Sequence, residues 1–453
     1  MEHVIWGEKD AFDHDHLLRD LCVLDCLLAL EFHQRKKERE RYAPLPSGFD
    51  PAHPAGIACQ MTKENNMLRI QLIKILLLVI VAAAMINGGM ELYEHRHFQL
   101  PLVAGPGITK VKKLSEYCEG IKGTMADTNV FFMEGKEPGG KVLILANTHS
   151  NEPAALLATL IFLENAVVEK GTLILIPQFN HSGSRNTRPG DGYPLYFDIP
   201  TDWGSKKFRM GNRDASWLDQ WPDPDVYVHY PDRQLLSFID TRNTNRTWPG
   251  RPDGPLMERV TYAAMQIIRE EKVDIAVDVH GAETMFPVTN CIVAPEKSIR
   301  IATMATLTVK AREKFDNHVE PSPSGFRGLS HREIGDFSDA MPFLLEAPIP
   351  FLDQPTGPKT VKLLLDGKDP FLLSLSKKGK LFVSYDETGW PIAKRVGQHC
   401  SVIQELMRQF TRKFPEKAIA VQNVPKYAEV VKNGVGHYYK NPDVVDKKNV
   451  YFN

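Results

Sequence analysis

Three residues with metal-binding side chains stand where apolar runs end. His149 and Glu152 follow the apolar run 142–146, and His280 follows a second, largely apolar run, 274–279. Two histidines and one carboxylate are the protein ligands of an open catalytic zinc site, in which water takes the fourth position. Ligand sites of open α/β sheets collect at the carboxyl ends of the strands. The sequence therefore predicts that these three residues hold zinc at one edge of a sheet.

A carboxylate inside an apolar strand is the candidate general base. Glu346 stands within the run 343–347, and an acidic side chain is almost never buried without a partner. Accepting a proton from zinc-activated water would account for its position. Glu283, three residues after His280, is the alternative base, and a place on the solvated face of the strand is the alternative explanation for Glu346.

An irregular region between residues 179 and 251 supplies guanidinium groups. It is rich in Gly, Pro, Asp, Asn and Arg, and an irregular insertion of this length in a compact domain is usually functional. Arginine is always charged and grips a carboxylate or an oxyanion with a planar fork. The candidates for such contacts are Arg185, Arg188 and Arg246, with solvated loop charges as the alternative.

In their order along the chain, these motifs resemble the zinc carboxypeptidase superfamily, and within it the succinylglutamate desuccinylase/aspartoacylase group. The shared pattern is His-x-x-Glu, an Asn-led turn followed by Arg-x-x-Arg, then Asn-Arg, a strand-end His and a late Glu on a strand. The chain departs from it at 180–183, where Asn-His-Ser-Gly replaces Asn-Pro-Asp-Gly, and the stretch from Arg188 to Asn245 is longer. The resemblance covers roughly residues 126–350.

The resemblance implies roles for the polar residues of the irregular region. Arg188 would stabilise the oxyanion, while Asn245 and Arg246 would hold a free carboxylate of the substrate, with Arg185 as a further substrate contact. The pair at 212–213 is a second Asn-Arg motif, but the pair at 245–246 is preferred because Trp-Pro-Gly and a helix follow it.

The resemblance also implies a fold and a reaction. The fold would be α/β, with a mixed, mostly parallel sheet and helices on both faces, as in the zinc carboxypeptidases. The reaction would be hydrolysis of an amide bond next to a carboxylate-bearing residue, in an N-acyl amino acid or at a peptide C-terminus. His331, on a Gly- and Ser-rich stretch, is a candidate for the mobile loop residue of the digestive members.

Two alternatives to this function stay open at the level of sequence. A carboxypeptidase and an amidoacylase need the same carboxylate clamp, so the motifs fit both. An extracytoplasmic binding protein could keep the fold and capture a carboxylate ligand without catalysis, although the complete ligand set and Glu346 favour an enzyme.

Composition excludes other classes of function. The chain has 453 residues and a formal net charge of −1, which gives no electrostatic basis for binding nucleic acid. Its six cysteines are too few and too scattered for a disulfide scaffold. The expected partner is a small-molecule or peptide substrate with a free carboxylate.

Short apolar runs bounded by turn residues predict strands, and longer periodic segments predict helices. The expected strands are Lys141–Ala146, Thr172–Pro177, Asp274–Val279, Asn290–Ala294 and Phe343–Ala347. The expected helices are Pro153–Val168, Pro255–Glu271, Ile299–Phe315 and Ile392–Phe410.

The N-terminal region predicts a location outside the cytoplasm. A basic stretch beginning at Met67 precedes the uninterrupted apolar run 75–86, which ends at 87–89. This pattern is typical of a secretory signal peptide, and the protein would then be periplasmic or secreted. The alternatives are a signal anchor, which would be the only membrane contact, and a buried core helix.

These observations predict four segments. Residues 1–66 are an extension, expected to be disordered or absent from the mature protein, and residues 67–90 are the signal peptide or anchor. Residues 91–413 form the zinc hydrolase domain with its lead-in, and residues 414–453 form a C-terminal tail.

The first prediction concerns the mature N-terminus. Mature chains are expected to begin near Ala84 to Gly89, because small residues follow the apolar run there. N-terminal sequencing of the protein from its native host measures this directly. A chain that starts at Met1 in the soluble cytoplasmic fraction would contradict both the signal-peptide and the anchor interpretations.

Overall fold

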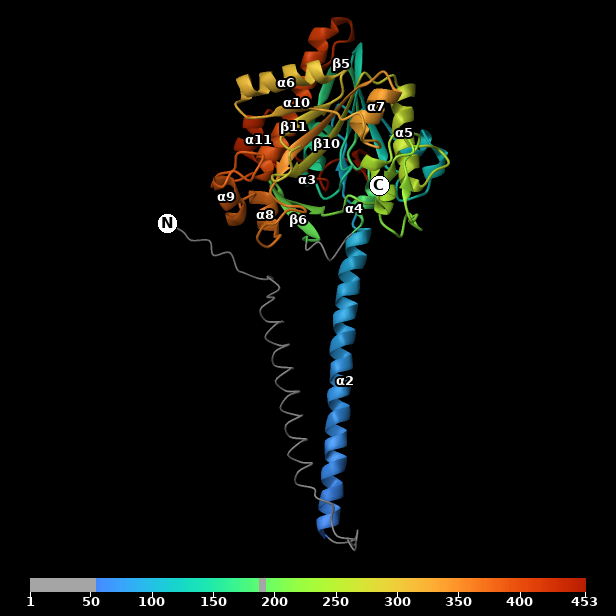
Figure 1. The fold of residues 1–453 in the computed structure, drawn as a ribbon, viewed down its shortest axis with the longest axis vertical. Helices are drawn as coiled ribbons and strands as arrows, with labels where there is room; N and C mark the ends of the chain where they lie inside the picture. Colours follow the sequence, from blue (N-terminus) through green and yellow to red (C-terminus); the bar gives the residue numbers. More distant parts are fainter. Residues whose placement is uncertain (1–53, 187–192) are drawn as a thin grey trace. The chain divides into compact units, whose positions relative to one another are not determined.

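The computed structural model describes residues 54–186 and 193–453 and is organised around one mixed sheet (Figure 1). The central strands β5, β4, β10 and β13 are parallel, as is the outer pair β11–β12, and antiparallel pairings join the remaining strands. The sheet has nine strands: β12 (His318–Pro321), β11 (Cys291–Ala294), β13 (Met341–Ile349), β10 (Ile275–Glu283), β4 (Glu137–Leu145), β5 (Val167–Ile176), β3 (Asn129–Glu134), β2 (Lys110–Lys113) and, beside β5, β14 (Ala420–Gln422).

The apolar runs form these central strands because both faces of the sheet are covered. Successive side chains of a strand point to opposite faces. On β4, Val142 and Ile144 belong to one buried hydrophobic cluster, whereas Leu143 and Leu145 belong to a second cluster. A strand buried on both faces needs apolar residues at every position, which explains why these strands are uninterrupted apolar runs in the sequence.

Helices pack on both faces, which confirms the α/β class with helices on each side. Figure 1 shows α6 and α10 on one side of the sheet and α5 on the other. The first cluster takes its helical residues from α3 (Pro153–Asn165), α6 (Ile299–Glu313) and α10 (Ile392–Lys413). The second takes them from α5 (Leu256–Glu270) and α7 (Ser330–Phe337).

The five strands and four helices expected from the sequence all form, with shifted ends. Shorter elements complete the fold. They are the strand pairs β1 (Leu102–Val103) with β15 (Val450–Tyr451), β6 (Tyr196–Thr201) with β7 (Gly204–Arg209), and β8 (Tyr227–Val228) with β9 (Leu235–Leu236); the helices α4 (His181–Ser184), α8 (Val361–Asp366), α9 (Pro370–Lys377) and α11 (Tyr427–Asn433); and the 3₁₀ turns η1 (Leu114–Glu116), η2 (Glu119–Ile121), η4 (Phe238–Arg242), η5 (Thr244–Arg246), η6 (Pro415–Lys417) and η7 (Lys447–Asn449).

The segment 414–453 belongs to the domain, in place of the appended tail indicated by the sequence. Its strand β14 pairs with β5, and α11 packs against α10. The side chain of Asn453 accepts hydrogen bonds from the backbone and side chain of Asn129 and donates one to Gln178. Little periodicity is visible in the sequence because each of these contacts uses only a few residues.

The N-terminal apolar run lies in α2 (Pro54–His97), which is longer than the run itself. The helix continues through Gly88 and Gly89, which follow the apolar run. Within α2, Asn65–His97 is long and apolar enough to cross a membrane, and none of its most apolar window is buried. A core helix would be buried, so this exposure does not fit the core-helix interpretation. The signal peptide and the anchor stay as the two predictions for this segment.

Two compact units divide the chain, Met1–Asn87 and Gly88–Asn453, so that the last residues of α2 belong to the second unit. Residues 1–53 of the expected extension lie outside the described residues. In the second unit, Cys118, Cys291 and Cys400 are buried and unpaired.

The second prediction tests a buried ion pair, between α3 and β7, whose carboxylate also contacts the C-terminal segment. The carboxylate of Glu164 on α3 is fully buried and meets Nζ of Lys206 on β7 at 2.8 Å and the backbone N–H of Lys440 at 2.6 Å. Lys206→Met leaves this carboxylate without its cation, which should cost about 3 to 5 kcal/mol of stability. Thermal unfolding followed by circular dichroism should show a lower midpoint.

The neighbouring exposed residue provides a matched control. Lys207 lies next to Lys206 on the solvent side of β7, so Lys207→Met should change the midpoint much less. Equal midpoints for the two variants would contradict the assigned importance of the buried ion pair.

Candidate metal centre and active-site cavity

The backbone brings the first two candidate ligands together just after β4. Asn147 adopts a left-handed conformation with φ of 61°, which asparagine tolerates better than most residues. The chain then turns, with the N–H of Glu152 bonded to the carbonyl of His149 at 3.2 Å. Pro153 opens α3, and Glu152 occupies its N-cap position without using its side chain as a cap. Its carboxylate is therefore available for another contact.

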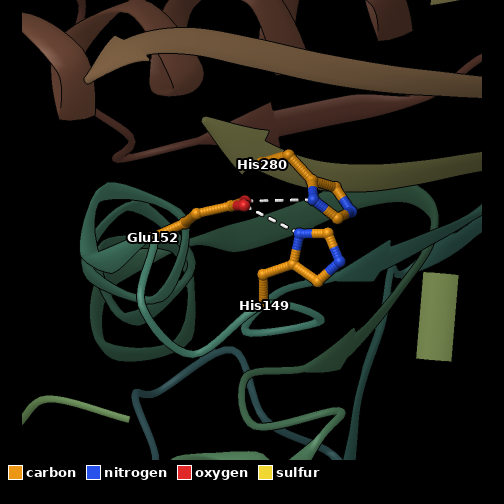
Figure 2. Close-up of side chains that lie close together, drawn as sticks. All are labelled: His149, Glu152 and His280. Atoms are coloured by element: carbon orange, nitrogen blue, oxygen red, sulfur yellow. Dashed lines mark hydrogen bonds and ion pairs between the residues drawn. The ribbon is translucent and has the colours of Figure 1, made fainter. Parts of the chain in front are cut away.

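The three predicted ligands converge (Figure 2). One ligand atom from each of His149, Glu152 and His280 lies within 4.8 Å of the other two. Glu152 Oε1 is 2.7 Å from His149 Nδ1, and Glu152 Oε2 is 3.0 Å from His280 Nδ1. All three side chains are buried. The geometry expected from the sequence for this group is therefore present.

Partners of the His149 ring fix which of its nitrogens carries the proton. Nε2 of His149 lies 3.0 Å from Oδ1 of Asn243, and that oxygen also accepts a hydrogen bond from the backbone N–H of Asn245. Because an amide oxygen only accepts, Nε2 of His149 must donate. Nδ1 of the neutral ring therefore directs a lone pair at Glu152.

His280 is arranged in the same way. Its Nε2 lies 3.0 Å from Oδ2 of Asp278, whose other oxygen accepts a hydrogen bond from Thr148 Oγ1 at 2.7 Å. This contact is an ion pair without hydrogen-bond geometry. In the neutral ring a proton on Nε2 would leave the Nδ1 lone pair directed at Glu152, whereas the protonated ring donates from Nδ1 to Glu152. Carboxylate or carbonyl partners on the outer nitrogen are usual for metal-binding histidines.

Charge within this group shifts the pKa of each member. Burial alone would raise the pKa of Glu152, but the two imidazoles outweigh it and hold the pKa far below its usual range. Burial lowers the pKa of His149. Burial also opposes protonation of His280, yet the carboxylates of Asp278 and Glu152 raise its pKa well above the usual value. The site is thus strongly favourable to positive charge.

These residues fit a divalent metal ion. Two imidazole lone pairs and a carboxylate face one another at 2.7 to 3.0 Å, so a proton or a cation is needed between them. Two nitrogens and one carboxylate oxygen form the donor set of catalytic zinc sites with an open fourth position.

A cavity of about 510 Å³ opens beside this group. His149, Glu152 and Glu346 line it together with the side chains of Arg213 and Arg246. Its apolar wall consists of Ala282, Phe286, Val288, Val293, Pro321, Pro323, Phe326, Leu329 and Leu344. Polar groups that converge in a largely apolar cavity are typical of a small-molecule site.

Glu346 reaches this cavity from β13. It pairs in register with His280 on β10, and side chains at paired positions of parallel strands share a face. Its Oε2 is buried and has no hydrogen-bond partner among the described residues. Burial raises the pKa of Glu346 well above its usual range, and the nearby Glu152 adds to this rise, although His280 opposes it.

The arginine of each Asn-Arg pair lines the cavity, although the sequence treated the two pairs as competitors. Arg246 donates to the carbonyl of Asn245 at 2.7 Å, and its guanidinium lies 5.3 Å from the ring of Phe326. Arg213 has a buried Nε without a hydrogen-bond partner among the described residues, and its closest paired carboxylate, Asp353, is 3.8 Å away. Burial would lower the pKa of Arg213, but attraction to Glu152 and other carboxylates raises it.

The remaining candidates differ in their positions. Glu283 and His331 line the cavity, as does Asn245, whose Oδ1 accepts a hydrogen bond from the N–H of Ser330. Arg185 is not among the lining residues and donates instead to the carbonyl of Arg96 at 2.7 Å. Arg188 lies outside the described residues, so its role as the oxyanion partner stays a prediction.

Two residues at the site were not expected from the sequence. Asn243 and Asp278 orient the imidazoles through their outer nitrogens. Asp278 carried a signal, because it is a carboxylate inside an apolar strand two positions before His280, and residues two apart on a strand share a face. Asn243 carried none, since it acts on a residue far away in the sequence.

No family model matches the chain, and neither does any curated protein. Similar solved structures include a metallo-carboxypeptidase from Burkholderia cenocepacia, with 14% identity, a TM-score of 0.40, and coverage of 72% of this chain and 69% of that one. Another is the tripeptide-bound cell shape determinant Csd4 of Helicobacter pylori, with 12% identity, a TM-score of 0.39, and coverage of 67% and 60%.

A succinylglutamate desuccinylase from Silicibacter sp. is similar over 49% of this chain and 54% of its own, with 17% identity and a TM-score of 0.30. These similar structures are from the carboxypeptidase and desuccinylase groups that the motif order resembles.

The third prediction concerns metal content. The purified chain should carry about one zinc ion, measured by inductively coupled plasma mass spectrometry after dialysis. His149→Ala or His280→Ala should abolish binding, because only two ligands would remain. Asn243→Ala should weaken the affinity by about 10- to 100-fold, because the imidazole of His149 loses its orienting partner.

A surface histidine serves as the control. His437 is half exposed and pairs with Asp202, so His437→Ala should keep its zinc. Full occupancy in the double variant His149→Ala/His280→Ala would refute the assignment of this site.

Proposed function

We propose that this protein is a zinc-dependent hydrolase that cleaves an amide bond next to a carboxylate-bearing residue. The observation that carries the proposal is the convergence of two imidazole lone pairs and one carboxylate at a cavity that also contains Glu346 and two arginines. Electron-rich ligands, a carboxylate that can exchange a proton and fixed positive charges together suit the hydrolysis of a polar, anionic substrate.

When bound, zinc supplies Lewis-acid polarisation of the scissile carbonyl and makes water more acidic. Glu346 is the proton acceptor in this scheme, because its unpartnered Oε2 is the buried acceptor on the strand next to His280. The same carboxyl group then returns the proton to the leaving nitrogen. Its raised pKa makes the carboxylate a stronger base, which favours the first of these two steps.

Arg213 and Arg246 would stabilise different negative charges during the reaction. Arg213 is the arginine attracted to Glu152, and its unpartnered Nε suits stabilisation of the developing oxyanion. Arg188 stays a proposal for the same role. Arg246, with Asn245, suits the free carboxylate of the substrate, since its side chain lines the cavity and its Nε is 3.8 Å from the carboxylate of Asp240.

We also propose a location for the protein, on the basis of the apolar helix α2. The apolar segment Asn65–His97 either directs export or anchors the chain. Under both interpretations the unit Gly88–Asn453 works outside the cytoplasm.

The fourth prediction separates catalysis from binding. Glu346→Gln keeps the shape of the side chain but removes the proton acceptor. Zinc and a carboxylate inhibitor should still bind, while the turnover of N-acyl amino acids or short peptides should fall by about 10²-fold or more. Isothermal titration calorimetry and steady-state kinetics measure the two effects. Comparing the two substrate types also distinguishes amidoacylase from carboxypeptidase activity.

Two variants complete this experiment. Glu283→Gln is the matched control, because Glu283 lines the same cavity and should leave the rate nearly unchanged. Arg246→Ala should mainly weaken binding of the inhibitor, since the carboxylate of the inhibitor loses a charged partner. A normal rate in Glu346→Gln with a low rate in Glu283→Gln would transfer the proton-acceptor role to Glu283. A protein with bound zinc and no turnover of either substrate type would instead be a carboxylate-binding protein.

A further inference from the structure

The loop 216–221, named here the tryptophan loop, exposes its large apolar side chains and buries two of its polar ones. A loop that faces water usually shows the opposite arrangement. The apolar members Trp217, Leu218 and Trp221 are 45%, 77% and 71% exposed. The polar members Ser216 and Gln220 are buried at 5% and 7%. Single exposed apolar residues are common, but a clustered group of large ones marks an interaction surface.

Buried hydrogen bonds hold the loop in this orientation. The side chain of Gln220 donates to the carbonyl of Thr241 at 2.8 Å and accepts from the N–H of Met257 at 2.9 Å. Trp217 is fixed as well, because the guanidinium of Arg242 lies 4.5 Å from its ring and its indole N–H donates to Asp223. The loop therefore presents its apolar side chains as part of a fixed structure.

The tryptophan loop adjoins the end of α2. Arg96, in the last turn of that helix, donates to Ser216 at 3.1 Å and to Asp219 at 2.8 Å. His95, one residue earlier, is fully buried and bonded to the carbonyl of Met210. These contacts lie within the unit Gly88–Asn453, so they join the loop to the point where the apolar helix leaves the domain.

Exposed apolar side chains continue along the helix from this junction. Met90 and Tyr93 are 58% and 65% exposed. Tyr93 precedes Arg96 by three residues, which is about 4.5 Å along a helix. If α2 spans a bilayer, its apolar surface therefore reaches the membrane interface within about one turn of the tryptophan loop. Tryptophan and tyrosine are enriched at this interface, where one end of the ring is apolar and the other is hydrated.

We propose that Trp217, Leu218 and Trp221 dock the unit Gly88–Asn453 on the interfacial layer of a lipid bilayer, beside the end of α2. This inference rests on the anchor interpretation of the location proposed above, in which the apolar part of α2 stays in the mature chain. It adds a second membrane contact, made by a loop of the hydrolase domain itself, to the apolar helix. Two contacts fix the orientation of the domain on the membrane, whereas a helix alone leaves it free to rotate.

The test uses the full chain in phosphatidylcholine vesicles with acyl chains brominated near the headgroup, because bromine quenches nearby indoles. Flotation on a density gradient first measures membrane association. Tryptophan fluorescence should then be quenched in the wild type. Trp221→Ser should lose a large part of this quenching, whereas Trp390→Ser, which removes a tryptophan bonded to the carbonyl of Ser384, should retain it.

A second pair of variants guards against a local folding effect. Leu218→Glu places a charge at a position that is 77% exposed, and Val444→Glu does the same at one that is 79% exposed. Leu218→Glu should reduce the quenching, because a charge opposes insertion into lipid, and Val444→Glu should not. Both variants should still float and keep the activity on a soluble substrate.

Three results would overturn the inference. If the chain floats but neither Trp221→Ser nor Leu218→Glu changes the quenching, the loop does not touch lipid, and the proposed location stands. If the chain does not float, the anchor interpretation and the docking surface are both wrong, while zinc binding and turnover still report on the proposed activity. If Leu218→Glu changes only the oligomeric mass in detergent, a second copy of the chain covers the loop instead.

Discussion

The arrangement of the site depends on electron-rich groups that repel one another unless positive charge lies between them. The Nδ1 atoms of His149 and His280 both face the carboxylate of Glu152. The fold maintains this arrangement by burying all three residues beside the neighbouring parallel strands β4 and β10. Asn243 prevents the ring of His149 from relieving the repulsion by changing tautomer. The structure is therefore prepared for a cation before one binds, at a cost in stability that metal binding would offset.

The sequence predicted the central part of the fold well because burial on both faces leaves a clear pattern. The last residues of β4 and β5, and the residues before His280 in β10 and before Glu346 in β13, are largely apolar. His149 and Glu152 follow β4, whereas His280 and Glu346 lie inside their strands, so the candidate metal ligands and the candidate proton acceptor could be proposed together. Local signals were sufficient here because each candidate residue is adjacent in the chain to its apolar segment.

Other parts of the site depend on contacts that have no local signal. Arg213 was set aside in favour of Arg246 because the sequence suggested one Asn-Arg pair, yet both arginines line the cavity. Arg185 was expected at the substrate but is bonded to the end of α2. The segment after Phe414 joins the sheet through β14, which contains only three residues. In each case the decisive partner is distant in sequence, and its position follows only from the assembled fold.

One amide oxygen connects the candidate metal ligands to the proposed carboxylate-binding residues. Oδ1 of Asn243 accepts hydrogen bonds from the ring of His149 and from the backbone of Asn245, which precedes Arg246. If a ligand displaces the 3₁₀ turn η5, the imidazole of His149 should therefore shift, and a shift of the imidazole should displace the turn. Thermodynamic reciprocity then requires equal effects in both directions. If a bound carboxylate raises the affinity for the metal by some factor, the metal raises the affinity for the carboxylate by the same factor.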